Sequence, residues 1–370
     1  QAHWHHFNFR LGSMDALNKE SKEISLAPFI ASDGSEIIPR RRFSYDTLII
    51  SVGSTINDFG IEGAAEHAIA LDNQKQAQKF HQKLHNAILK AQTQKDEISK
   101  GQLEVVIVGA GATGVELSAE LHKATREMTA YGLDKINPDK DIRISLIEAS
   151  DRLLPALPKR MSLSVDRELK KLNVNLYLNE RVTNVSESGI QTHTGRFIPS
   201  ALVVWAAGIK APEFLRYLGL RINGINQIIV KSTLQSIDDD SIFAFGDCAA
   251  CPIKPGAKEE VPPRAQSAHQ QASLLVKTMK LLVKKKNYNL PQYSYKDYGS
   301  LVNLGRYSTV GNLMGSLAGG SMFIEGFIAR IMYLMLYQMH LIALHGITVV
   351  SLRLIAKFIT RRTETHVKLH

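Results

Sequence analysis

The stretch EVVIVGAGATGVELSAEL, residues 104–121, decides the fold of the chain. It opens with a short β-branched run, residues 105–108, that is typical of a strand buried in a parallel sheet. The next six residues, 109–114, match the pattern GxGxxG, and helical periodicity starts directly after them. A strand, a glycine turn and a helix in this order predict a dinucleotide-binding unit.

Each glycine of this turn has a distinct physical role. Gly109 permits the tight turn, Gly111 lets the backbone approach a pyrophosphate, and Gly114 lets the helix pack closely on the strand. The free N–H groups at the helix N-terminus then face the phosphates. An isolated GxGxxG is often only a flexible loop, so the flanking strand and helix carry the assignment.

A second strand, expected over residues 142–147, ends at Glu148. A carboxylate there can accept hydrogen bonds from both ribose hydroxyls and would repel a 2′-phosphate, which predicts NADH rather than NADPH. Glu148 follows Gly114 by 34 residues, a longer gap than usual, because residues 135–141 add a loop. The alternative is an ordinary surface glutamate at a strand end.

Two further hydrophobic strands close on a glycine. The first covers residues 45–52 and ends at Gly53, and the second covers residues 202–206 and ends at Ala207 and Gly208. The sequence thus has two hydrophobic strands that end at a glycine but only one glycine-rich turn. This predicts two dinucleotide-binding domains, of which the first is incomplete because it lacks such a turn.

The strand expected over residues 241–245 ends at Gly246 and Asp247. Gly-Asp is a frequent turn, but here it also presents a carboxylate at the edge where α/β sheets bind ligands. Cys248 and Cys251 follow as an isolated CxxC pair, for which a structural role is favoured over a redox pair or half of a metal site. No metal site is expected.

Residues 262–271, PPRAQSAHQQ, begin a helix, with the prolines before its first turn. Gln266 and Gln270 share one face of it, and the dipole at its N-terminus would stabilise negative charge on a ligand such as a reduced flavin. Earlier in the chain, a hairpin is expected around residues 32–34 and an amphipathic helix over residues 72–94.

The net charge of +10 lies at the end of the chain. Residues 1–276 hold 32 basic and 32 acidic side chains, whereas residues 277–370 hold 13 and 3. Residues 331–350 have no formally charged side chain, but Gly346 interrupts them and polar residues form a stripe along them. This pattern favours two amphipathic helices on an anionic membrane surface over a transmembrane helix or an oligomer interface. The broad apolar faces argue against nucleic acid.

Together these motifs resemble the bacterial type II NADH dehydrogenases, which are single-subunit flavoprotein NADH:quinone oxidoreductases. The resemblance rests on the closure at 45–54, GAGATGVELSAEL (109–121), LIEA (146–149), VVWAAGIKAP (203–212), FGDCAACP (245–252), PPRAQSAHQ (262–270) and LYQMHLIALHG (336–346). It implies hydride transfer from NADH to FAD and then transfer of two electrons to a membrane quinone, without proton pumping. It also implies a peripheral protein on the cytoplasmic face of the bacterial inner membrane. The basic tail makes an anionic lipid surface an expected partner, and a homodimer is a possible arrangement, because the sequence does not specify the oligomeric state.

The resemblance further implies roles for individual residues. Glu116 would lie between the nicotinamide and quinone regions and help to deliver protons, although a carboxylate stabilised by the helix dipole is an equal alternative. The expected NADH residues are Gly109, Gly111, Gly114, Glu148, Ala207 and Gly208; the expected FAD residues are Gly53, Gly246 and Asp247; Gln266 and Gln270 would lie by the flavin and the quinone.

The expected fold is therefore α/β, with two Rossmann-like domains and C-terminal amphipathic helices on the membrane surface. The expected segments are a partial FAD-binding domain (1–99), an NADH-binding domain (100–225), a return to the FAD domain with the quinone-site helix (226–318) and membrane-associating helices (319–370). The family's first glycine-rich turn is missing from the sequence, which predicts an N-terminal truncation. Two alternatives stay open: a soluble pyridine-nucleotide oxidoreductase with another acceptor, and an NADH-binding fragment without flavin.

Overall fold

The computed structural model describes residues 7–129, 133–284, 289–305, 309–315 and 320–360. The chain forms two compact units, each built from two separate stretches of sequence. Unit 1 consists of Gln1–Thr55 and Ile209–Asp297, and unit 2 consists of Ile56–Gly208 and Tyr298–His370.

Unit 2 is built on a five-stranded parallel sheet with the strand order β11-β10-β9-β15-β8. Its strands are β8 (Ala68–Ala70), β9 (Glu104–Val108), β10 (Arg143–Ile147), β11 (Asn175–Tyr177) and β15 (Leu202–Trp205). Every residue of β9 and of β15 is buried, as expected for apolar strands covered on both faces. The predicted strand, glycine turn and helix are confirmed, since α4 (Ala112–Thr129) follows β9 directly after the turn.

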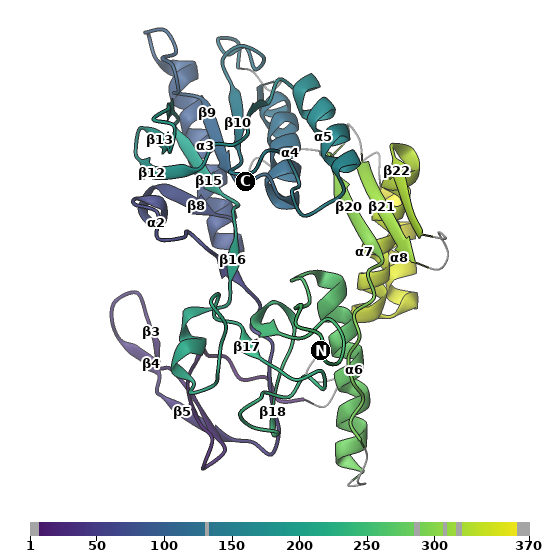
Figure 1. Ribbon diagram of the computed structural model, residues 1–370. Helices are drawn as coiled ribbons and strands as arrows, with labels where there is room; N and C mark the ends of the chain where they lie inside the picture. The colour runs from purple at the N-terminus through teal and green to yellow at the C-terminus, as the bar shows by residue number, and fades with distance from the viewer. Residues whose placement is uncertain (1–6, 130–132, 285–288, 306–308, 316–319, 361–370) are drawn as a thin grey trace. The chain divides into compact units, whose positions relative to one another are not determined.

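Helices cover this sheet (Figure 1). Besides α4 they include α3 (Gln74–Thr93) and α5 (Lys159–Lys171), and the short α2 (Ala64–His67) precedes β8. The amphipathic helix predicted over residues 72–94 is confirmed as α3, because its apolar side buries Phe80, Leu84 and Ile88 in the same core as β9 and α4. A small antiparallel sheet, β12 (Val182–Ser186), β13 (Gly189–Thr192) and β14 (Phe197–Pro199), completes this part of the unit.

The C-terminal part of unit 2 is an antiparallel sheet followed by two helices. The sheet consists of β20 (Gly299–Asn303), β21 (Thr309–Gly315) and β22 (Gly320–Glu325), and α7 (Phe327–His345) and α8 (Ile347–Thr360) follow it. The sheet lies between the helix pair α4 and α5 on one side and α7 on the other (Figure 1). The predicted helix break at Gly346 is confirmed, with a φ of +80° at that residue. None of the described helices is long and apolar enough to cross a membrane.

Unit 1 is made of smaller sheets and one long helix. A predicted hairpin is confirmed as β3 (Phe29–Ile30) and β4 (Glu36–Ile38), flanked by the antiparallel sheet β1 (Met14–Asn18), β2 (Glu23–Leu26) and β5 (Arg41–Ser44). Two parallel pairs follow: β6 (Leu48–Ile50) with β18 (Ile242–Ala244), and β17 (Ile228–Ile229) with β19 (Ala249–Ala250). The predicted helix after residue 262 is α6 (Ala265–Val283). The 3₁₀ turns η1 (Glu213–Tyr217) and η2 (Gly246–Cys248) and the short strands β7 (Thr55–Ile56) and β16 (Ile209–Lys210) complete the chain.

The compact units divide the sequence at other places than the expected functional segments do. Residues 56–99 belong to unit 2 because α3 packs into the core of the parallel sheet. The strands after residue 298 join the same core through Val302, Leu304 and Val310. The functional boundaries at residues 99, 225 and 318 stay a prediction.

Candidate functional site

The glycine turn between β9 and α4 has the geometry that close approach requires. Gly109 has a φ of +101°, and a Cβ placed on it would lie 2.7 Å from the Ala207 Cα. A Cβ on Gly114 would lie 1.9 Å from the Gly109 carbonyl oxygen, whereas a Cβ on Gly111 would meet no heavy atom within 4 Å. Two glycines therefore serve packing of the turn, and Gly111 leaves open space at the N-terminus of α4, where a pyrophosphate would approach.

Glu148 is attached to this turn by its side chain. One carboxylate oxygen accepts a hydrogen bond from the Ala110 N–H (2.8 Å), and the other accepts one from the Ser150 N–H (2.9 Å). The Gly109 N–H donates in turn to the Ile147 carbonyl oxygen (2.7 Å). The acid at the end of β10 is therefore held beside the glycine turn, where the ribose of a dinucleotide lies.

The order of strands gives the site a direction. Glu148 follows β10 on one side of β9, whereas Ala207 and Gly208 follow β15 on its other side. A dinucleotide with its adenosine ribose at Glu148 and its pyrophosphate at the turn extends towards Ala207 and Gly208. NADH thus fits the described residues, and the individual roles of these residues stay predictions.

The residues expected to bind FAD meet at one edge of unit 1. Since β6 and β18 are parallel, Gly53 and Gly246 follow carboxyl ends that point the same way. The Ser54 hydroxyl donates to the Asp247 carboxylate (2.8 Å), and the Gly246 N–H donates to the side-chain oxygen of Gln271 (2.8 Å). The arrangement fits a ligand with hydroxyl groups, because a carboxylate accepts several hydrogen bonds. Sequence reasoning missed Ser54 and Gln271; their only signal is their position directly beside predicted site residues.

Gln266 and Gln270 both lie near the start of α6 and both bind the segment that ends unit 1. The Gln270 amide donates to the Lys296 carbonyl oxygen (2.8 Å) and accepts from the Lys296 N–H (3.1 Å). The Gln266 amide donates to the Asp297 carboxylate (3.2 Å), which also pairs with Arg264 (3.3 Å). Both glutamines therefore orient this segment along the helix, and their expected places beside flavin and quinone stay predictions.

Glu116 lies in the first part of α4, in unit 2. Its carboxylate is half-buried and accepts a hydrogen bond from the Asn303 N–H (2.9 Å). Burial raises the pKa of Glu116, and the negative charge of Glu120 adds to this effect. On α7, burial likewise raises the pKa of Tyr333, with further contributions from Glu116 and Glu120. Beside them is a pocket of about 200 Å³ lined by Glu120, Lys123, Asn303, Gly305, Arg330, Tyr333 and Leu334. Glu116 is thus placed to hold a proton at higher pH than an exposed glutamate would.

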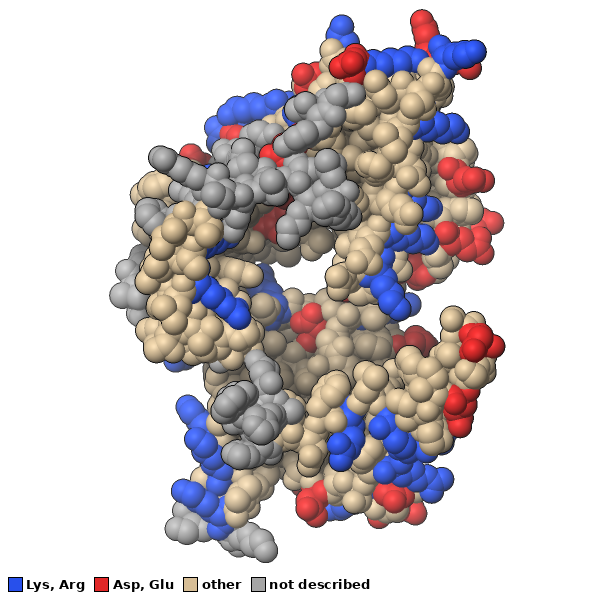
Figure 2. Space-filling model, turned by 180° about the vertical axis from the view of Figure 1, so that it is seen from behind, with Lys and Arg blue, Asp and Glu red and all other residues tan. Residues whose placement is uncertain are grey.

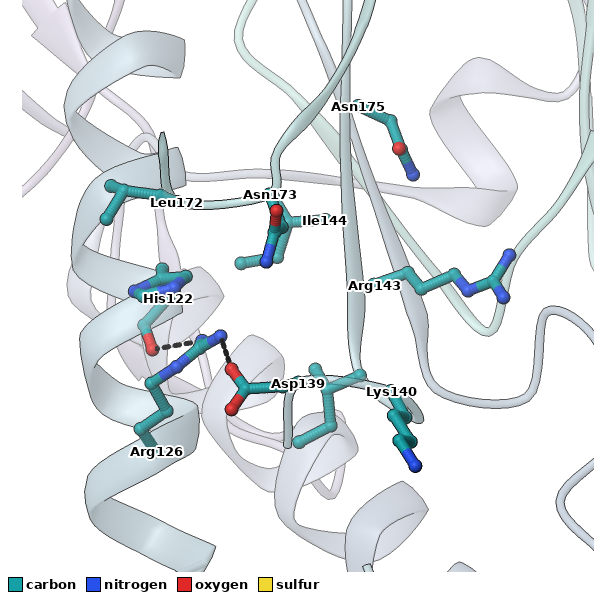
Figure 3. A pocket seen from close by; sticks show the side chains of 10 residues that line it. His122, Arg126, Asp139, Lys140, Arg143, Ile144, Leu172, Asn173 and Asn175 are labelled. Carbon is teal, nitrogen blue, oxygen red and sulfur yellow. Dashed lines mark hydrogen bonds and ion pairs between the residues drawn. The ribbon is translucent and has the colours of Figure 1, made fainter. Parts of the chain in front are cut away.

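A larger pocket, of about 330 Å³, lies at the amino ends of β10 and β11 (Figure 3). Arg126 forms an ion pair with Asp139 there, and burial lowers the pKa of His122 to about 4, so that this imidazole is neutral at pH 7. Lys140 and Arg143 point away from His122 (Figure 3). The cations therefore do not converge on one ligand, and this pocket is not part of the candidate site.

The two cysteines are buried and free. Burial raises the pKa of Cys251 to about 12 and also raises that of Cys248. Both side chains are therefore neutral thiols at physiological pH, in keeping with the favoured structural role. Among the described residues, no group of three or more His, Cys, Asp or Glu side chains could hold a metal ion.

The parallel sheet, its glycine turn and the acid at the next strand form a dinucleotide-binding unit. In agreement, residues 17–272 match the family described as pyridine nucleotide-disulphide oxidoreductase. The type II NADH:quinone oxidoreductase of Haemophilus influenzae is 39% identical over 379 residues, covering 99% of this chain and 84% of that protein. The chain belongs to the type II NADH:quinone oxidoreductase family within that class.

More distant relatives agree. A probable NADH dehydrogenase of Dictyostelium discoideum is 30% identical over 72% of this chain and 58% of its own length. Among solved structures, NDH2 of Plasmodium falciparum in complex with NADH superimposes with a TM-score of 0.77 at 21% identity, covering 95% of this chain and 83% of that one. This structural similarity shows that the two proteins share their fold.

Proposed function

We propose that the chain is an NADH:quinone oxidoreductase that passes a hydride from NADH to FAD and then two electrons to a membrane quinone. The observation that carries the proposal is the geometry of the NADH site. The Glu148 carboxylate accepts a hydrogen bond from the glycine turn, and Gly111 of that turn faces open space. The relationship to the Haemophilus influenzae enzyme over nearly the whole chain supports the same activity.

The described residues supply binding and orientation for this reaction. FAD, when bound, would accept the hydride and release electrons one or two at a time, which is chemistry that no side chain here provides. The N–H groups at the start of α4 would bind the NADH pyrophosphate, Glu148 its ribose hydroxyls, and Asp247 the hydroxyls of the flavin side chain. Gln266 and Gln270 would lie by the flavin and the quinone. Glu116 would hold a proton for the quinone, because its raised pKa keeps it protonated at higher pH.

The C-terminal helices are suited to a membrane surface. On α7 the side chains of Phe327, Leu334, Met335 and Met339 are more than half exposed, and Leu352 and Ile359 on α8 are about two-thirds exposed or more. Uncharged atoms dominate the surface over α7 and α8 in Figure 2, with isolated basic side chains among them. We place this surface on the cytoplasmic face of the bacterial inner membrane, where it would meet anionic lipids and the quinone. A homodimer interface is the alternative use of these helices.

The decisive experiment measures flavin absorbance and NADH-dependent reduction of a water-soluble quinone analogue on the purified chain. Flavin absorbance together with quinone reduction supports the proposal. NADH binding without flavin absorbance would instead support the flavin-free alternative, and reduction of a disulfide but not of a quinone would support the soluble one.

Membrane attachment has its own test, flotation with vesicles of anionic lipid. Replacing Arg353 and Lys357 on α8 by Gln should weaken vesicle binding about 30-fold, since each basic residue near an anionic surface contributes roughly 1 kcal/mol. The matched control replaces Lys75 and Lys79, two exposed lysines with the same spacing on α3, and should leave binding unchanged. Equal vesicle binding by both double variants would refute the assignment of α8 to the lipid surface.

A further inference from the structure

Phe59 has a backbone conformation that an aromatic residue rarely adopts. Its φ is +54°, in the left-handed region where a Cβ crowds the backbone, and its side chain is 60% exposed. Because the phenyl ring is largely exposed, its burial contributes little free energy to offset the strain of the backbone. Such strain persists only where the surrounding structure imposes it, and it is concentrated at functional sites.

The surrounding structure does impose it. The Asn57 N–H donates to the Gly208 carbonyl oxygen (3.3 Å), and the Trp205 indole N–H donates to the Asn57 carbonyl oxygen (2.9 Å). The Asn57 side chain then accepts the N–H of Phe59 itself (3.0 Å). These bonds attach Asn57 to Trp205, at the end of β15, and to Gly208 just after it, and they hold the backbone of Phe59 to Asn57.

The Phe59 ring lies over Gly208. A Cβ placed on Gly208 would lie 2.3 Å from the Phe59 Cζ and 2.7 Å from its Cε2, so the edge of the ring occupies the space that any other residue at position 208 would need. Gly208 itself has a φ of +67°. Only a glycine fits beneath this ring. The strained backbone at Phe59 and the glycine at position 208 are therefore both needed for the ring to pack on residue 208.

This arrangement lies on the nicotinamide side of the sheet. The adenosine ribose is assigned to Glu148 after β10, and the dinucleotide extends past the glycine turn towards the residues after β15. Ala207 contacts the turn through Gly109, and the next residue, Gly208, lies under Phe59. The exposed aromatic ring therefore stands where the nicotinamide half of the cofactor arrives.

We propose that Phe59 forms an aromatic wall of the nicotinamide subsite and positions the nicotinamide ring by contact with its own ring. The proposal rests on the NADH site proposed above. Two aromatic rings attract each other in offset or edge-to-face geometry, so the contact fixes the orientation of the nicotinamide as well as adding affinity. Backbone strain at Phe59 is the cost of holding the ring there.

The test uses two ligands that differ only in whether they carry the nicotinamide. NAD⁺ has the ring and no hydride to transfer, whereas ADP-ribose lacks the ring, and calorimetry measures the Kd of each on the full chain. Phe59→Gly should weaken NAD⁺ roughly tenfold and leave ADP-ribose unchanged. Glycine adopts a positive φ without strain, so the variant should keep or raise the Tm of the wild type.

The outcomes separate the possible explanations. A lower Tm of Phe59→Gly with an unchanged Kd for NAD⁺ would show that the ring only stabilises the packing of the loop, and would overturn the proposal. Equal weakening of NAD⁺ and ADP-ribose would also overturn it, because the ring would then act on the whole site. A wild-type chain that binds neither ligand would refute the NADH site itself together with this proposal. Phe197→Ala, at an exposed phenylalanine of β14 in the same unit, is the control and should change neither affinity.

Discussion

The three glycines of the turn do not have the same function, and alanine substitutions should separate them. Gly111→Ala adds a methyl group to space that holds no heavy atom within 4 Å. Alanine is a weaker N-cap than glycine by about 0.5–1 kcal/mol, but it also restricts the unfolded chain by about 0.4–1 kcal/mol, so the two effects nearly cancel. The variant should therefore have the Tm of the wild type.

Its affinity for NADH should nevertheless fall. The new methyl group would occupy the space through which the pyrophosphate is proposed to approach the start of α4. Loss of one hydrogen bond to a charged phosphate is worth about 1.5–3 kcal/mol, or roughly 10- to 150-fold in Kd. Gly114→Ala should do the opposite first: its methyl group would meet the Gly109 carbonyl oxygen at 1.9 Å. A clash this close puts the cost of overpacking near its upper end, about 3 kcal/mol, which exceeds the gain of about 1 kcal/mol in helix propensity by about 2 kcal/mol. The Tm should therefore fall by roughly 4–8 °C.

Calorimetry with NAD⁺ and a thermal melt followed by circular dichroism measure both quantities on each variant. Gly224→Ala, at a glycine of unit 1 with no heavy atom within 4 Å of an added Cβ, is the control and should change neither. Wild-type affinity for NAD⁺ in Gly111→Ala would refute the placement of the pyrophosphate. An unchanged Tm in Gly114→Ala would refute the packing role of that residue.

Three further outcomes are expected. Glu148→Gln should reduce the preference for NADH over NADPH by about tenfold or more, because it removes the charge that repels the 2′-phosphate; an unchanged ratio of the two Kd values would contradict this role. Glu116→Gln should have little effect on Tm at low pH, where the carboxyl of the wild type is neutral. As pH increases from 4.5 through the raised pKa of Glu116, the Tm of the variant should rise relative to that of the wild type, because ionising a buried carboxyl costs folding free energy. A difference in Tm that does not depend on pH would count against burial as the cause. Iodoacetamide at pH 8 should not modify Cys251 in the folded chain, since a pKa of about 12 leaves roughly one thiolate in 10⁴ molecules; rapid alkylation seen by mass spectrometry would show that the thiol is exposed or activated.

Local patterns were sufficient to predict most elements of the fold. The β-branched run before Gly109 became β9, the apolar stripe after residue 72 became the buried side of α3, and Gly346 separates α7 from α8. The division into units could not be read in this way. The division depends on which hydrophobic core α3 and the strands after residue 298 join. Hydrophobic periodicity predicts which face of a helix or strand is buried, but it does not predict which element packs against that face.

The site was predictable where a residue follows a strand end and hidden where it acts through backbone contacts. The positions of Gly111 and Glu148 after β9 and β10 could be predicted, because a dinucleotide-binding turn combines glycines with an acid at the end of the next strand. Phe59 could not be predicted, because an aromatic residue in a loop has no distinctive pattern, and the only signal of Ser54 is its position beside Gly53. The strain at Phe59 is visible only as a dihedral angle, and the partner of Ser54 is 193 residues away in the sequence.

With the ribose bound at Glu148 as proposed, the two hydrogen bonds of this carboxylate also limit how the cofactor can change. A change of preference to NADPH would require replacement of the carboxylate. Replacement by a small apolar residue, however, would leave the N–H groups of Ala110 and Ser150 without their acceptor. Ala110 is fully buried and Ser150 is half-buried. A buried donor without an acceptor is costly, so the loss would loosen the turn that is proposed to bind the pyrophosphate. In this assignment, cofactor preference and the stability of the turn depend on the same carboxylate, so a change to NADPH should first place a neutral acceptor such as glutamine at position 148 and only then introduce a cation.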